Sequence, residues 1–148
     1  MSASATLRHR MPAMRPLRLA RWWVVLWLLA IAAMVAVSVL PAPAVPAPEL
    51  PQLDKALHFG AYLGVSTFAS MLFASPRARS LAALLLLVVG VGVEAAQHFL
   101  TATRQAEVAD VFANTLGIVG GLLLGATPVA HGLQWLESRL PVSAPRPL

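Results

Sequence analysis

Residues 81–100 read LAALLLLVVGVGVEAAQHFL, an apolar stretch that carries Glu94 and Gln97 in its last third. A helix needs about 20 mostly apolar residues to cross the hydrocarbon core of a bilayer, and this stretch has that length. A carboxylate inside such a helix is costly unless it faces protein or water. Residues 81–100 are therefore predicted to form a transmembrane helix with Glu94 turned away from lipid.

Three more stretches of similar length and character accompany this one. The whole chain of 148 residues is 58% hydrophobic and only 11% charged, with a mean hydropathy of +0.73, values typical of an integral membrane protein. We predict an all-α fold, a four-transmembrane-helix bundle that leaves no room for a soluble domain. The chain contains no cysteine, which excludes disulfides and thiolate chemistry. The predicted spans cover residues 22–40, 56–74, 81–100 and 108–127.

The distribution of basic residues predicts the orientation of this bundle. Nine of the 11 Lys and Arg residues lie before the first span, between the second and third, or after the fourth, whereas Lys55 and Arg104 lie on the opposite side. Cytoplasmic loops of membrane proteins carry such an excess, so both termini are predicted to be cytoplasmic in a bacterial plasma membrane. The net charge of +5 is thereby explained by topology and anionic lipid, and no basic–aromatic interleaving indicates nucleic-acid binding.

The segments before the first span and after the fourth are predicted to lie in the cytoplasm. Residues 1–21 form a basic cytoplasmic N-terminus, and residues 128–148 form a surface helix, with Glu137 and Arg139 facing water, followed by a disordered tail. The first span could alternatively be a signal peptide cleaved after residues 42–44. Its apolar run exceeds the roughly 7 to 15 residues of a signal sequence, which favours a retained anchor.

Five prolines between residues 41 and 51 predict an extended polyproline-like spacer, either a lid over the polar residues or, in the favoured reading, a plain linker.

Polar residues recur at helical spacing near the outer end of the last three spans. Asp54, His58 and Tyr62 follow one another by four and share one face of the second span. In the third span Glu94 and Gln97 are three apart, with His98 four residues after Glu94. These positions predict a polar groove inside the outer half of the bundle. The fourth span adds one stripe, listed in order: Asp110, Asn114, Gly117, Gly121 and Gly125.

The glycine stripe indicates close helix packing, because glycines at this spacing let another helix approach. It should point Asp110 and Asn114 into the bundle, and it is also a candidate surface for a homo-oligomer. Polar groups in such bundles often serve only to hydrogen-bond helices together. Here three helices each bring several polar groups to one depth, which favours a functional site over simple packing.

The order of these residues resembles the VanZ-like membrane protein family, whose pattern is Asp-Lys-x-x-His-Phe-x-x-Tyr, Glu-x-x-Gln, Arg, and Asp-x-x-x-Asn with a trailing glycine. The resemblance covers about residues 54–125, and His98 and Glu107 are not part of it. It implies a multi-pass envelope protein without an agreed reaction, in a family named after a protein linked to teicoplanin resistance. The matching residues are Asp54, Lys55, His58, Phe59, Tyr62, Glu94, Gln97, Arg104, Asp110, Asn114 and Gly117.

Three functions are compatible with this sequence. The first is an enzyme acting on a lipid-linked glycan, cell-wall precursor or other envelope lipid, with Glu94 or Asp110 as general acid or base and His58 as a second proton carrier. The second is an accessory protein that binds an anionic envelope component without catalysis, and the third and least favoured is a transporter. The candidate substrate-binding residues are Asp54, Lys55, Tyr62, Gln97, Arg104 and Asn114.

No cofactor is predicted. A divalent metal held by His58 and the nearby carboxylates is disfavoured, since no tight ligand motif such as His-Glu-x-x-His is present.

Overall fold

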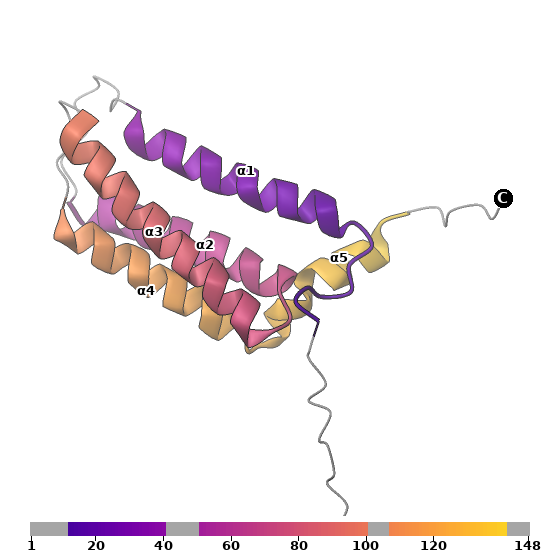
Figure 1. Cartoon of the computed structure of the whole chain (residues 1–148). Helices are drawn as coiled ribbons and strands as arrows, with labels where there is room; N and C mark the ends of the chain where they lie inside the picture. Colours follow the sequence, from indigo (N-terminus) through magenta and orange to yellow (C-terminus); the bar gives the residue numbers. More distant parts are fainter. Residues whose placement is uncertain (1–11, 41–50, 101–106, 142–148) are drawn as a thin grey trace, which may run out of the picture.

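The computed structural model describes residues 12–40, 51–100 and 107–141, and these parts are helical apart from turns and one isolated bridge between Met14 and Phe73. The all-α prediction is therefore confirmed for the described residues. Helices α2, α3 and α4 lie side by side, α1 lies along one side of them, and α5 lies beside the start of α1 (Figure 1). The elements are α1 (Ala20–Val39), α2 (Pro51–Leu72), α3 (Pro76–Leu100), α4 (Val108–Leu124), the 3-10 turn η1 (Pro128–His131) and α5 (Gly132–Arg139).

The described helices support a membrane protein, though with fewer clear spans than predicted. α1 and α3 are long and apolar enough to cross a membrane, and α4 with η1–α5, bent by 77°, would add a third if the pair forms one span. α2 does not qualify by the same criterion. It carries Asp54, Lys55 and His58 in its first two turns and Ser66 and Ser70 on the face toward α4, which lowers its hydropathy.

The glycines of α4 decide how it packs on α2. A Cβ on Gly117 would meet the Phe59 carbonyl oxygen, and one on Gly121 would lie 2.5 Å from Ser66 Cβ. Ser66 Oγ donates to the Ile118 carbonyl at 2.8 Å, so the close approach is also hydrogen-bonded. The predicted close packing is confirmed, but α2 of the same chain covers the stripe. Gly117, Gly121 and Gly125 thus lie against α2 within one chain, and the predicted homo-oligomer through them stays a prediction.

α1 is attached to the bundle by few contacts. Its buried side chains are Trp27 and Ile31, and Trp27 Nε1 donates to the Val65 carbonyl at 2.9 Å. Most of its other large apolar side chains face outward, as Val37, 66% exposed, illustrates. An apolar helix exposed to this extent is stable where hydrocarbon surrounds it.

Glu137 on α5 lies buried against the start of α1, which corrects the prediction that it faces water. Its carboxylate accepts hydrogen bonds from the backbone nitrogens of Arg18 at 2.7 Å and Leu19 at 2.8 Å, and from Trp23 Nε1 at 2.7 Å. α1 has no side-chain cap from its own N-cap residue, so Glu137 satisfies these amides. Burial alone would raise the pKa of Glu137, but the hydrogen bonds from Leu19, Arg18 and Trp23 outweigh it and lower that pKa.

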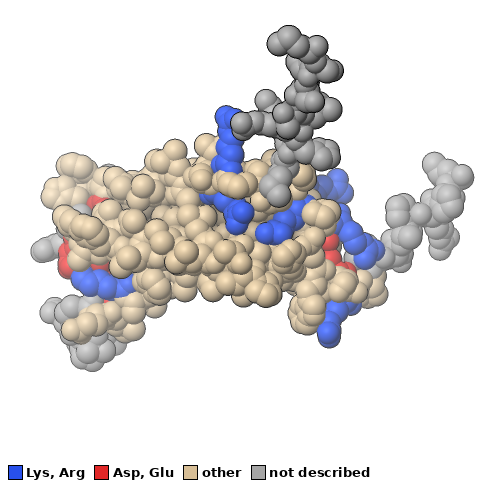
Figure 2. All heavy atoms as spheres, turned by 90° about the horizontal axis from the view of Figure 1, so that it is seen from below, with Lys and Arg blue, Asp and Glu red and all other residues tan. Residues whose placement is uncertain are grey.

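The two ends of the molecule differ in charge. Arg15 Nε donates to the Ser70 carbonyl at 3.2 Å and Arg79 Nη1 to the Gly125 carbonyl at 3.3 Å, which gathers arginines where α2 and α4 end. Lys55 lies where α2 and α4 begin, beside Glu107 and Asp110. Uncharged residues cover the surface between the charged groups at the two ends (Figure 2).

Candidate functional site

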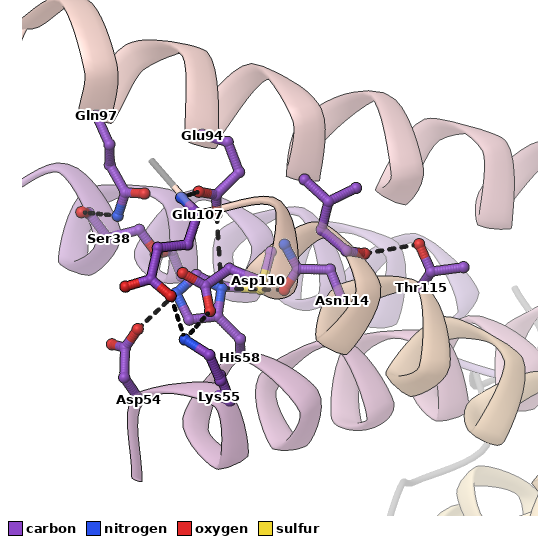
Figure 3. A network of polar contacts seen from close by, with 12 residues as sticks. Ser38, Asp54, Lys55, His58, Glu94, Gln97, Glu107, Asp110, Asn114 and Thr115 are labelled. Carbon is purple, nitrogen blue, oxygen red and sulfur yellow. Dashed lines mark hydrogen bonds and ion pairs between the residues drawn. The ribbon is translucent and has the colours of Figure 1, made fainter. Parts of the chain in front are cut away.

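The candidate site lies at the end away from the arginines, where the start of α2, the end of α3 and the start of α4 meet. Polar side chains from all three helices converge there (Figure 3). Six predicted site residues are each at most 8% exposed, although all of them carry polar groups. Burial of this kind requires partners for the polar atoms. The six residues are His58, Tyr62, Glu94, Gln97, Asp110 and Asn114.

His58 is oriented by Asn114. His58 Nδ1 lies 3.0 Å from Asn114 Oδ1, and because an amide oxygen only accepts, this contact assigns the proton to Nδ1. In the neutral ring Nε2 then carries the lone pair, and it lies 4.0 Å from Asp54 Oδ2. A histidine held by one nitrogen with the other free to take a proton has the arrangement of a general base.

Glu94 lies near Nδ1 of His58, the same ring nitrogen that Asn114 contacts. Its Oε2 accepts from the Glu107 backbone nitrogen at 3.3 Å, while Oε1 lies 3.9 Å from His58 Nδ1. A carboxylate at this distance would stabilise the imidazolium that forms when His58 takes a proton.

Three buried polar atoms at the site have no hydrogen-bond partner among the described residues: Tyr62 Oη, Glu94 Oε1 and Asn114 Nδ2. Two of them border Gly90, since a Cβ there would lie 3.2 Å from Tyr62 Oη and 3.3 Å from Asn114 Nδ2. Buried polar atoms are normally satisfied, and each exception calls for an explanation such as a catalytic role or a bound water or ion. Gly90 thus keeps space open beside groups that retain hydrogen-bonding capacity.

Lys55 joins α2 to the start of α4. Its Nζ lies 2.6 Å from Glu107 Oε2 and 3.3 Å from Asp110 Oδ1. The hydrogen bond to Glu107, followed by that to Asp110, raises the pKa of Lys55 above its ordinary value. Asp110, whose side chain is 4% exposed, therefore has a cationic partner. Sequence reasoning left Glu107 unassigned, although its position three residues before Asp110 at the N-cap of α4 could have indicated a shared partner.

Not every predicted site residue joins the cluster around His58. Gln97 Nε2 donates to the Ser38 carbonyl at 3.0 Å, so at least part of its hydrogen bonding ties α3 to the end of α1. His98 is exposed. Arg104 lies outside the described residues, as do the candidate cleavage site at residues 42–44 and the proline-rich spacer up to residue 50, whereas Pro51 begins α2.

The described part of the site is acidic. Asp54, Glu94, Glu107 and Asp110 are accompanied by a single lysine, Lys55. One oxygen each of Asp54 and Asp110 and one nitrogen of His58 all lie within 4.8 Å of one another, so these three residues offer a donor set that a divalent cation accepts. Lys55 already neutralises Asp110, which weakens this metal site.

Comparisons with protein-family models, with curated proteins and with solved structures find no match for this chain. The resemblance to the VanZ-like family therefore stays a prediction from the motif residues, and the functional argument rests on the geometry of the site.

Proposed function

We propose that this chain is a VanZ-like multi-pass protein of the bacterial plasma membrane, with four spans, both termini in the cytoplasm and its polar site facing outward. Arg15 and Arg79 lie where α2 and α4 end, whereas His58 lies near the start of α2, and this separation supports the orientation because cytoplasmic ends are arginine-rich. The weak hydropathy of α2 is compatible with a span, since Ser66 and Ser70 donate to carbonyls of α4 and need no water.

Within this frame, the function that we propose is acid–base catalysis on a lipid-linked glycan or another envelope lipid. His58 Nε2 takes a proton from a hydroxyl or a water molecule, whose oxygen then forms a bond to the headgroup as the bond between the headgroup and its leaving oxygen breaks. Asn114 keeps the ring in the required tautomer, and Glu94 stabilises the imidazolium. The observation that carries this proposal is the buried contact of 3.0 Å between His58 Nδ1 and Asn114 Oδ1.

The His58 imidazolium then returns its proton from Nε2 to the leaving group, while Lys55 and the Asp110 carboxylate hold each other beside it. If the substrate is a lipid-linked cell-wall precursor, a reaction on its headgroup would connect this protein with resistance to glycopeptides of the teicoplanin type. A non-catalytic protein that binds an anionic component is less well supported, because the four described carboxylates would repel such a ligand.

The test compares envelope lipids and glycan precursors by mass spectrometry in a deletion strain. The strain carries wild type, His58→Gln, Glu94→Gln, Asp110→Asn or no gene, with His98→Gln as the matched control because His98 is exposed. We expect one species to accumulate on deletion and to be cleared by wild type and His98→Gln but not by the three site variants. An unchanged lipid profile, or full clearance by His58→Gln, would overturn the enzymatic function.

A further inference from the structure

A cavity of about 380 Å³ lies between α1 and α2 and ends at the candidate site. Its volume falls within the range of about 300–1,000 Å³ that is usual for small-molecule sites. The wall on α1 includes Ala33, Met34 and Val37, and the wall on α2 includes Leu57 and Ala61. These side chains are all apolar, so the walls suit a hydrocarbon.

The end of the cavity has a different character, because Asp54 and His58 line it. His58 Nε2 is the nitrogen that Asn114 leaves free, and it faces the Asp54 carboxylate. A wholly apolar ligand would leave these two groups unused, whereas a wholly polar ligand would gain nothing from the walls. The polarity of the cavity therefore matches an amphiphile with one chain in the groove and a headgroup beside His58.

The walls of the cavity are accessible from the side of the bundle. Val37 is 66% exposed and Leu57 is 62% exposed, which places both at the surface between the two helices. α1 is one of the two clear candidate membrane spans, so hydrocarbon is the phase that meets this face. A helix from a second copy, about 10–12 Å across with its side chains, is too wide for a cavity of this volume.

We infer that the groove between α1 and α2 binds a hydrocarbon chain of an envelope lipid, which enters sideways from the bilayer and presents its headgroup to His58. The role of the headgroup rests on the proposed function, but binding of the chain requires no turnover. The ligand class is a membrane amphiphile whose chain lies along Ala33 and Ala61.

The experiment uses the full chain in nanodiscs of phosphatidylcholine doped with zwitterionic phosphatidylethanolamine that carries a diazirine on one acyl chain. After illumination, labelled peptides are mapped by mass spectrometry. We expect residues 33–38 and 57–62 to carry more label than the outward face of α1 at Leu29, which is 60% exposed. Ala33→Trp should remove this excess by filling the groove. Ala32→Trp should retain it, because Ala32 is exposed, as Ala33 is, but does not line the cavity.

Where Ala33→Trp does not express, Ala61→Leu fills the same groove with a smaller side chain. Even labelling along α1, equal labelling in the Ala32 and Ala33 variants, or chain-to-chain crosslinks at the groove would overturn the inference. Groove labelling in a protein whose deletion leaves the envelope lipids unchanged would instead count against the proposed reaction alone. Clearance of the lipid by a protein without groove labelling would count against the groove alone.

Discussion

His58 Nδ1 lies 3.0 Å from Asn114 Oδ1, and this single hydrogen bond leaves Nε2 as the ring nitrogen that faces Asp54 and the groove. The orientation of the His58 ring is thus fixed by a contact between α2 and α4, the two helices that approach closely at Gly117 and Gly121. The tautomer of His58 and the packing of α4 should consequently respond to the same substitutions.

Replacing Asn114 should change the tautomer of His58. In Asn114→Leu the ring loses its acceptor, and we expect the proton on Nδ1 to redistribute toward Nε2. Nitrogen NMR of histidine-labelled protein distinguishes the two forms, and His58→Gln assigns the signal. Loss of a buried hydrogen bond should also lower the free energy of unfolding by about 1–3 kcal/mol. A ring that keeps its Nδ1 proton in the variant would show that Asn114 does not orient it.

Gly90→Ala should disturb the site, whereas Gly92→Ala should not. The new Cβ at position 90 would lie 3.2 Å from Tyr62 Oη and 3.3 Å from Asn114 Nδ2, but a Cβ at position 92 meets nothing within 4 Å. Overpacking costs about 1–3 kcal/mol, against a gain of up to about 1 kcal/mol from replacing glycine in a helix. We expect Gly90→Ala to lose activity and Gly92→Ala to be at least as stable as wild type, as measured by lipid clearance and thermal unfolding in detergent.

Gly117→Ala should separate α4 from α2. Its Cβ would meet the Phe59 backbone oxygen and would lie 2.9 Å from the Leu63 nitrogen, and backbone atoms cannot move aside as a flexible side chain does. We expect destabilisation of at least about 2–3 kcal/mol, at the upper end of overpacking effects. Gly60→Ala on α2 is the control, because it has open space around it. Equal melting temperatures for the two variants would contradict the close packing.

Stability should fall in acid through Glu137. Its folded-state pKa lies below its ordinary value of 4.5, so its contribution is complete above pH 4.5 and is lost as the pH falls through the lowered pKa. Glu137→Gln should therefore be less stable than wild type at neutral pH, and the difference should shrink below pH 4.5. Thermal unfolding across this range tests the sign of the pH dependence, with Asp54→Asn as a variant of an acidic residue whose side chain is 49% exposed. A difference that grows in acid would exclude this role.

The spacing of residues in the sequence predicted which side chains share one face of a helix. It did not predict the contacts between helices that are far apart in the sequence. The stripe from Asp110 to Gly125 was readable because each residue follows the last by one helical turn. Glu137 was misread because its partners are backbone nitrogens at the other end of the chain, which no spacing reveals. Gln97 is a predicted substrate-binding residue, and spacing did not predict that its amide also donates to the Ser38 carbonyl. Contacts from a side chain to a remote backbone depend on the packed fold and leave no pattern in the sequence.

The contact between Glu137 and the start of α1 also bears on the order of assembly. α1 is synthesised first, but the acceptor for its Arg18 and Leu19 amides comes near the end of the chain. Until residue 137 has left the ribosome, those two amides at the start of α1 can hydrogen-bond only to other acceptors such as water or lipid headgroups. Once α5 is in place, Glu137 accepts the hydrogen bonds from these amides. The N-terminus of α1 is therefore fixed only after α5 has packed against it.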